Sequence, residues 1–287
     1  MRNTTRLKEL AAKREALTVP GVANALFARV AEDAGFPVIY ATGAGIANMH
    51  LGAPDIGLTT LTEVAAAVAA IADAVSVPVI VDADTGFGNS LNMVRTVRVL
   101  ERAGAAGLQI EDQVFPKRCG HFAGKHIVPA DEMIQKIKAA TDARKDRDLQ
   151  IIARTDARAV DGLDAAIDRA HRFAEAGADI TFVEAPVSLA ELKRIAAELA
   201  VPQVANIVHG GRTPDPGRAA LAEMGFSIVL YANAGLQAAL RAAAQVYAAL
   251  KNDGSLENVV DLLADFEERQ HAVSKDAWDS LENKYQT

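Results

Sequence analysis

One junction recurs along this chain: the end of a helix-like segment, a glycine, and then a short apolar strand. It reads EDAGFPVIY, ERAGAAGLQI, AEAGADITFV and AEMGFSIVL, with the glycines at Gly35, Gly104, Gly177 and Gly225. Glycine is common just past a helix C-terminus because it adopts the left-handed backbone conformation without strain. A chain that repeats this junction is predicted to alternate helices with strands.

Further strands are predicted in VSVPVIVDAD and LAVPQVANIV, in LQIIARTD, and in a short stretch near LTVPG, which brings the total to eight. Helical segments separate most of them, such as TEVAAAVAAIADAV, which Thr60 and Glu63 open as a capping box. This alternation predicts right-handed βαβ units and a parallel sheet. Eight units favour a (β/α)₈ barrel, with an open doubly wound sheet as the alternative.

The chain length of 287 residues suits one barrel domain over residues 1–287. Beyond Tyr231 the sequence reads as helix almost to its end, which is more helix than one barrel needs. We therefore treat residues 236–287 as a C-terminal helical extension, and we expect part of it to cover a partner subunit.

Composition narrows the classes of partner. The net charge of −7 argues against nucleic acid or an anionic membrane surface as the main partner, while a small anionic ligand can still bind beside local cations. The single cysteine rules out an internal disulfide. We find no hydrophobic signal core at the N-terminus and no run long enough to span a membrane, so we expect a cytoplasmic protein.

Polar residues stand at nearly every predicted strand end. In a (β/α)₈ barrel the carboxyl ends of the strands carry the chemistry. One such carboxylate is readily explained as a helix N-cap, but the set is not, because converging carboxylates are costly unless a cation neutralises them. The residues are Asp82, Asp84, Glu111, Arg154, Asp156, Glu184 and Asn206.

The acids among these residues indicate a metal site. Asp82 and Asp84 are two positions apart, and Glu111 ends the neighbouring strand. Oxygen ligands without a histidine or cysteine cluster favour Mg²⁺, or Mn²⁺, over zinc. Asp55, in GAPDIG, could support the site through water, although it reads equally well as a turn aspartate after Pro54.

Arg154 and Asn206 are the predicted partners of an anionic substrate, since a guanidinium grips a carboxylate with two hydrogen bonds. The alternative is that Arg154 pairs with Asp156 or with another acid at a strand end. The stretch TGAGIAN resembles part of a dinucleotide-binding GxGxxG motif, but Asn48 replaces its third glycine. We predict instead that backbone N–H groups between Thr42 and Gly45 bind a carboxylate; a plain glycine turn is the other interpretation.

The only cysteine, Cys119, lies in VFPKRCGHFAGKHIVP, which reads as a loop after a strand. The neighbouring Lys117, Arg118 and His121 favour a thiolate or ready proton exchange. We therefore predict a functional thiol, carried by a loop that can close as a lid.

The run VDADTGFGN … IEDQVFPKRCGH … IIARTDA resembles the isocitrate lyase and phosphoenolpyruvate mutase superfamily over roughly residues 19–234. The resemblance implies a (β/α)₈ barrel, dependence on Mg²⁺, and a homotetramer in which terminal helices swap between subunits. Within the superfamily, Lys-Arg-Cys-Gly-His marks the carbon–carbon lyases, including methylisocitrate lyase. The phosphonate-forming mutases carry an asparagine-containing loop there instead.

The resemblance also implies a role for each site residue. Asp82, Asp84 and Glu111 would serve Mg²⁺ directly or through water. Tyr40 matches a candidate base and Cys119 the general acid. The positive groups around Cys119 would stabilise negative charge as the bond beside the deprotonated hydroxyl breaks, leaving a 2-oxo acid and an enolate. The positions that match the substrate pocket are Thr42, Gly43, Ala44, Arg154, Glu184 and Asn206.

Two departures bear on the substrate. Methylisocitrate lyases tend to follow the motif with Arg-Pro-Asn-Lys, where this chain has Phe-Ala-Gly-Lys, and here NIVHGGRTP, with His209, follows the seventh strand. The missing arginine removes a partner for a third carboxylate, which favours an alkylated malate such as 2,3-dimethylmalate. The alternatives are an oxaloacetate decarboxylase or phosphonomutase on the same fold, the latter disfavoured by Cys119, and a barrel that binds a carboxylate without catalysis.

Overall fold

Eight parallel strands close into a barrel in chain order, with the last strand hydrogen-bonded to the first. The computed structural model describes residues 1–118, 120 and 124–286. The predicted barrel is confirmed, and the alternative of an open sheet is wrong. The strands are β1 (Leu17–Val22), β2 (Ile39–Ala41), β3 (Val79–Asp82), β4 (Gly107–Glu111), β5 (Gln150–Thr155), β6 (Ile180–Val183), β7 (Gln203–Asn206) and β8 (Ile228–Tyr231).

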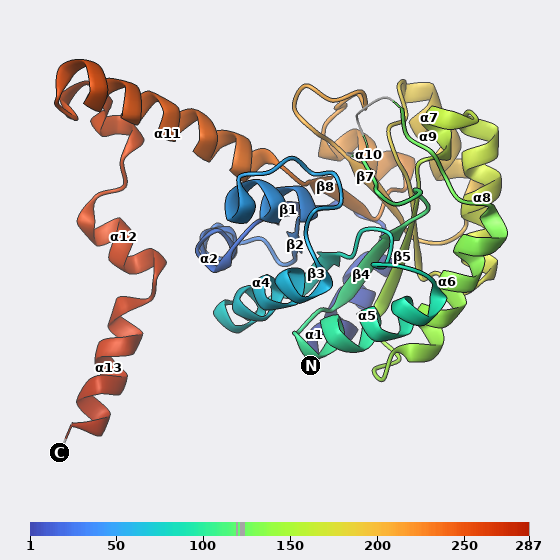
Figure 1. Cartoon of the computed structure of the whole chain (residues 1–287), viewed down its shortest axis with the longest axis horizontal. Coiled ribbons are helices and arrows are strands. Elements are labelled where there is room, and N and C mark those ends of the chain that lie inside the picture. The colour runs from blue at the N-terminus through green and yellow to red at the C-terminus, as the bar shows by residue number, and fades with distance from the viewer. Residues whose placement is uncertain (119, 121–123, 287) are drawn as a thin grey trace.

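Helices surround the strands (Figure 1) and bury apolar side chains against their outer faces. The helices around the barrel are α2 (Ala25–Asp33), α4 (Leu61–Ala74), α5 (Ser90–Arg102), α6 (Ala130–Ala143), α8 (Leu163–Glu175), α9 (Leu189–Glu198) and α10 (Arg218–Met224). Three short segments lie in the connections after β2 and β5, namely α3 (Gly43–Ile46), the π-helical η1 (Ala47–Leu51) and α7 (Ala157–Val160).

Helix α1 (Asn3–Ala12) covers the amino-terminal end of the barrel. Its Leu7 and Ala11 are buried in the same cluster as the inward-facing side chains of the strands. A Cβ on Gly107, the first residue of β4, would lie 2.9 Å from Leu7 Cδ2, so the helix packs directly on the strand starts. With that end closed, the carboxyl ends of the strands are left to carry the site.

The glycine in each recurring junction has the left-handed backbone conformation that the sequence predicts. Gly35, Gly104, Gly177 and Gly225 have φ values of 84°, 103°, 108° and 96°, a region that disfavours side chains bearing a Cβ. The capping box at the start of α4 is also present, because the Thr60 hydroxyl accepts from the Glu63 amide and the Glu63 carboxylate accepts from the Thr60 amide.

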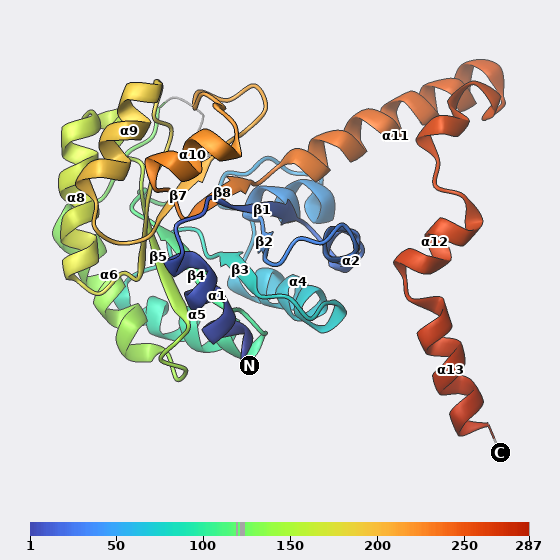
Figure 2. The same ribbon diagram turned by 180° about the vertical axis from the view of Figure 1, so that it is seen from behind.

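The C-terminal extension is helical, as expected, although its first helix starts at Ala234 rather than at 236. It comprises α11 (Ala234–Asp253), the 3₁₀ segment η2 (Glu257–Leu262), α12 (Phe266–Ala272) and α13 (Lys275–Tyr285). Helix α11 leads away from the barrel and the others continue it as an arm outside the barrel (Figures 1 and 2). In the part of the chain that the structure describes, no helix is both long and apolar enough to cross a membrane.

Candidate active site

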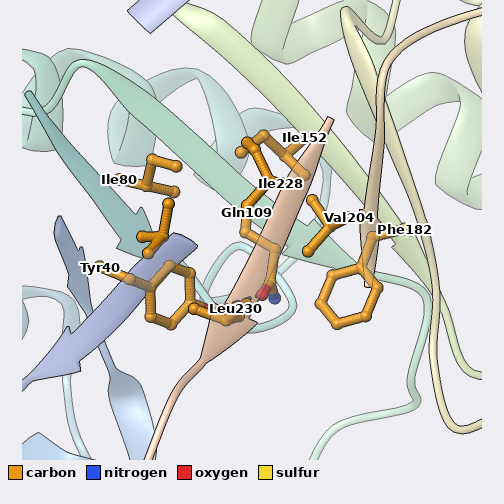
Figure 3. Close-up of a pocket in the computed structure, with 9 residues that line it drawn as sticks. Tyr40, Ile80, Gln109, Ile152, Phe182, Val204, Ile228 and Leu230 are labelled. Atoms are coloured by element: carbon orange, nitrogen blue, oxygen red, sulfur yellow. Dashed lines mark hydrogen bonds between the residues drawn. The ribbon is translucent and has the colours of Figure 1, made fainter. Parts of the chain in front are cut away.

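The barrel interior is mainly apolar. Side chains such as Ile80, Ile152 and Val204 point into its centre from several strands, and Gln109 adds a polar group (Figure 3). Tyr40 and Phe182 belong both to this layer and to a second, more polar cavity at the carboxyl ends of the strands. The apolar layer therefore forms the floor of the polar cavity.

The polar cavity brings together residues from widely separated parts of the chain. Asp82 and Asn206 end β3 and β7, Arg154 lies near the end of β5, and Glu184 directly follows β6. Most of the predicted site residues are thus gathered at one place. The predicted residues that line the cavity are Tyr40, Thr42, Ala44, Asp55, Asp82, Lys117, Arg154, Glu184 and Asn206.

Asp82 faces this cavity and Asp84 turns aside from it. The carboxylate of Asp82 accepts hydrogen bonds from the Gly43 amide at 3.3 Å and from Gln109 Nε2 at 3.3 Å. Asp84 has a left-handed backbone, with φ of 47°, and its Oδ1 lies 2.7 Å from Lys117 Nζ as an ion pair without hydrogen-bond geometry. Lys117 also pairs with Asp55, so it lies between two of the predicted metal acids.

Among the described residues, no three acidic, histidine or cysteine side chains are arranged to hold a metal ion by themselves. The role predicted for Asp82, Asp84 and Glu111, serving a metal directly or through water, stays a prediction. Any cation at this place would need water or ligand oxygens to complete its coordination, which is the usual situation of Mg²⁺ in enzymes.

Electrostatics around Glu111 favour an additional positive charge. Burial raises the pKa of the Glu111 carboxyl well above its usual value, even though Arg154 opposes the shift. Glu111 Oε1 has no hydrogen-bond partner among the described residues. Burial likewise raises the pKa of Asp84 to about 6 against the opposing effect of Lys117. A buried carboxylate oxygen without a hydrogen-bond donor in the described part of the chain, such as Glu111 Oε1, suits a divalent cation.

Arg154 pairs with acids, as one of the two interpretations of the sequence predicted, and its role toward a substrate stays a prediction. Its Nε and Nη2 lie 3.0 and 3.1 Å from the two carboxylate oxygens of Asp156, as the alternative predicted. Its Nη1 also lies 3.3 Å from Glu111 and 3.4 Å from Glu184, and the side chain lines the cavity. The guanidinium is therefore held by acids at a place where a ligand can reach it.

Asn206 offers the cavity an unused acceptor. Its Nδ2 donates to Glu184 at 3.3 Å, and its Oδ1 is buried without a hydrogen-bond partner in the described part of the chain. A buried acceptor of this kind is costly unless a ligand or water donates to it. A hydroxyl group on a ligand would meet that need.

The Thr42–Gly45 stretch forms the first turn of α3 rather than an open glycine loop. The Gly45 amide donates to the Thr42 hydroxyl at 3.3 Å, while the Gly43 amide donates to Asp82. Two of the amides assigned to a substrate carboxylate are thus already bonded within the protein. A Cβ on Gly43 would lie 3.0 Å from Asp82 Oδ2, which explains the glycine there.

Tyr40 donates a hydrogen bond to Gln109 Oε1 on the cavity floor. Burial, reinforced by the negative charge of Asp82, raises the pKa of the Tyr40 phenol well above its usual value. Near neutral pH the phenol therefore keeps its proton.

The segment around the KRCGH motif packs against the cavity. Cys119 and His121 lie outside the described residues. A Cβ on Gly120 would lie 2.4 Å from Arg154 Nη2 and 2.7 Å from Glu184 Cδ, so only glycine permits this approach. The side chain of Arg118 is exposed and is not brought to the cavity, although its backbone is held by the Gln113 side chain through bonds of 2.9 and 2.8 Å.

Three residues near the site were not selected from sequence: Gln109, Lys125 and Asn233. Gln109 and Asn233 line the cavity, and Lys125 is buried beside Asp156. A glutamine within the apolar strand GLQIE was a visible signal for Gln109. Lys125 carried no such signal, because it appeared as one of several basic residues in a loop.

Comparison with known proteins matches residues 7–251 to the phosphoenolpyruvate phosphomutase family. The chain is 43% identical to a 2,3-dimethylmalate lyase of Eubacterium barkeri, over 100% of this chain and 99% of that protein. It is 43% identical to a 2-methylisocitrate lyase of Aeropyrum pernix, over 96% and 92%. A solved structure of phosphonopyruvate hydrolase with oxalate and Mg²⁺ superposes with a TM-score of 0.89 at 30% identity, covering 99% of both chains.

Proposed function

From the membership of this chain in the phosphoenolpyruvate phosphomutase family, part of the superfamily that includes isocitrate lyase, we propose that it is a carbon–carbon lyase. Its proposed substrate is a 2-hydroxy dicarboxylate of the alkylmalate type, such as 2,3-dimethylmalate, cleaved to a 2-oxo acid and a second carboxylate. One observation carries the proposal: Gly120 of the KRCGH motif packs directly on Arg154 and Glu184 of the polar cavity.

Mg²⁺ is the proposed metal, with Mn²⁺ as a substitute. Asp82 would hold it from the cavity, with Asp84, Glu111 and Asp55 acting through water. Glu111 Oε1 has no hydrogen-bond partner among the described residues, which supports a cation nearby. When bound, the ion would polarise the 2-oxygen of the substrate and lower the pKa of its hydroxyl. The small number of protein carboxylates suits Mg²⁺, which keeps several waters.

The chain's own groups have separate tasks in the proposed reaction. Arg154 binds a substrate carboxylate, together with the turn of Thr42, Gly43 and Ala44, and Asn206 Oδ1 accepts from the hydroxyl. Tyr40 is the candidate base for the 2-hydroxyl proton. Loss of that proton lets the C2–C3 bond break, and its electrons remain on the departing carboxylate as an enolate.

Protonation of the enolate falls to Cys119, whose place in the chain is beside Gly120. Lys117, Arg118 and His121 are the proposed sources of positive charge that stabilise the enolate. Of these, Lys117 is the one that lines the described cavity. Glu184 would hold the side chains of Arg154 and Asn206 in the orientation needed to bind the substrate, because it contacts both.

We also propose a homotetramer in which the arm packs on neighbouring subunits. Phe266, Trp278 and Tyr285 on the arm are 72%, 64% and 72% exposed. Large apolar groups exposed together on an extended element are typical of protein interfaces. A second copy of the chain is the proposed occupant.

The proposed activity is tested with a substrate panel in which release of a 2-oxo acid is followed with and without Mg²⁺. The panel contains 2,3-dimethylmalate, 2-methylisocitrate, isocitrate, oxaloacetate and phosphonopyruvate. We expect the highest kcat/KM for 2,3-dimethylmalate and no turnover after chelation of the metal. A preference for phosphonopyruvate or oxaloacetate would replace the lyase assignment, and tight binding without turnover of any acid would favour a carboxylate-binding barrel.

A further inference from the structure

Lys125 is buried next to the cavity: it does not line the cavity itself, but it contacts Gly120, which does. The Lys125 side chain is 1% exposed, and its Nζ lies 2.6 Å from Asp156 Oδ1. The same ammonium donates a hydrogen bond to the carbonyl of Gly120. Lys125 thus joins the backbone of the KRCGH segment to the carboxylate that holds Arg154.

The position of Asp156 is fixed on its other side. Its backbone amide donates to Asp112 Oδ1 at 2.9 Å. Asp112 is itself held by the Thr155 hydroxyl at 2.7 Å and by Arg169 at 3.1 Å. With its backbone fixed in this way, the Asp156 carboxylate has two cationic partners, Arg154 and Lys125.

Charge balance shows what Lys125 contributes. Arg154 has three acids within 3.4 Å, namely Asp156, Glu111 and Glu184. If Lys125 were absent, Arg154 would be the only cationic partner of Asp156 among the described residues. The guanidinium would then interact more strongly with Asp156 and less strongly with a ligand. A second cation on Asp156 leaves more of the Arg154 field for a ligand, because charges in a buried cluster are only weakly screened.

We propose that Lys125 is a positioning residue: by pairing with Asp156 and holding the Gly120 carbonyl, it keeps Arg154 oriented and available for the carboxylate of the ligand. The inference rests on the proposed function, in that the ligand is a small carboxylate. Lys125 itself does not line the cavity, so its effect reaches the ligand through Asp156 and Gly120.

The test measures binding of oxalate by calorimetry in the presence of Mg²⁺, together with steady-state kinetics on the best substrate of the panel. Lys125→Met removes the charge and both hydrogen bonds, and Lys125→Gln keeps a donor without the charge. We expect Lys125→Met to weaken oxalate binding by roughly tenfold or more, the range typical of residues that orient a ligand-binding group, and Lys125→Gln to weaken it less. We also expect KM to rise more than kcat falls.

Coupling through Asp156 is tested with Asp156→Asn and the double variant. Because Lys125 acts partly through Asp156 and partly through Gly120, the double variant should weaken oxalate binding by less than the product of the two single effects. Arg144→Met is the matched control, because Arg144 pairs with Asp179 at 2.5 Å near the amino-terminal ends of β5 and β6. It should lower the melting temperature while leaving the Kd for oxalate within about twofold.

Two results would overturn the inference. One is an unchanged Kd for oxalate in folded Lys125→Met, or in Lys125→Gln if the first variant does not fold. The other is a set of strictly additive effects in the double variant. These results leave the proposed function standing if the wild-type chain turns over its substrate. A wild-type chain that neither binds oxalate nor cleaves any acid would overturn both.

Discussion

At the scale of single residues, Gly120 sets how closely the KRCGH segment approaches the cavity. Its Cα lies so near the Arg154 and Glu184 side chains that an added Cβ would fall 2.4 and 2.7 Å from their atoms. Both side chains are buried and paired, so neither can move aside without breaking ion pairs. The close approach of this segment to the cavity therefore depends on a missing side chain.

The Gly120→Ala variant should lose activity while remaining folded. We expect kcat/KM to fall by roughly 100-fold, since a shift of about 1 Å in an active-site group can cost that much. Steady-state kinetics and thermal unfolding measure the two effects separately. Gly235→Ala is the control, because a Cβ there would meet only ordinary contacts of 3.7 Å or longer. Equal activity in both variants would show that the approach of Gly120 is not required.

The Cys119→Ser variant tests the proposed proton donor. We expect kcat to fall by about 100-fold or more, the usual contribution of a positioned general acid, because a serine hydroxyl is a far weaker acid than a thiol. Binding of oxalate should stay within about twofold of wild type. A near-normal kcat would remove Cys119 from the mechanism.

The sequence predicted the residues at the strand ends and missed some that contact them, such as Gln109 and Lys125. Asp82, Arg154 and Asn206 could be predicted from the sequence because parallel strands in a barrel present their carboxyl ends at one face. Lys117 was predicted as loop charge, yet it is buried against Asp55, 62 positions away. Contacts of that range depend on the closed barrel, and no local pattern encodes them.

At the scale of elements, local backbone chemistry made the barrel predictable. The glycine that ends a helix acts through its own backbone conformation, and the four predicted positions all have positive φ. The structure of the connection after β2 was harder to predict from the sequence. A single turn of α3 followed by a π-helical segment replaces the expected loop, since Thr42 caps the turn and Asp82, from another strand, holds its Gly43 amide.

Removing the cap of α4 should affect stability and not catalysis. In Thr60→Ala the Glu63 amide loses its acceptor, which should lower the free energy of unfolding by about 1 kcal/mol. Chemical denaturation measures the change, and kcat per folded molecule should be unaltered. The neighbouring exposed Thr62→Ala, which keeps the cap, should change stability by less than half as much. Similar losses in both variants would contradict the assignment of the cap.

At the scale of the whole molecule, the arm is the part that a single barrel does not explain. Helix α12 contacts α2, and Arg29 donates to Ser274 at 2.6 Å, but most of the apolar side chains of the arm face outward. The sequence predicted the surplus helix. It could not give the path of the arm, because that path depends on contacts beyond the local pattern.

Removing large apolar side chains from the arm should reduce the number of subunits in the assembly. We expect Phe266→Ser combined with Trp278→Ser to shift a tetramer to smaller species in light scattering or sedimentation, since each loses a large apolar surface at the proposed interface. The nearby exposed polar variant Asn283→Ser should keep the wild-type mass. A wild-type chain that is already monomeric would contradict the proposed assembly.

The most direct test of the central claim, carbon–carbon cleavage through a protonated enolate, is product analysis by NMR after incubation with 2,3-dimethylmalate and Mg²⁺ in D₂O. Cleavage between C2 and C3 predicts equimolar pyruvate and propionate, and an enolate protonated by an exchangeable group predicts one deuterium at C2 of the propionate. Failure to form pyruvate, or propionate without deuterium, would contradict the account.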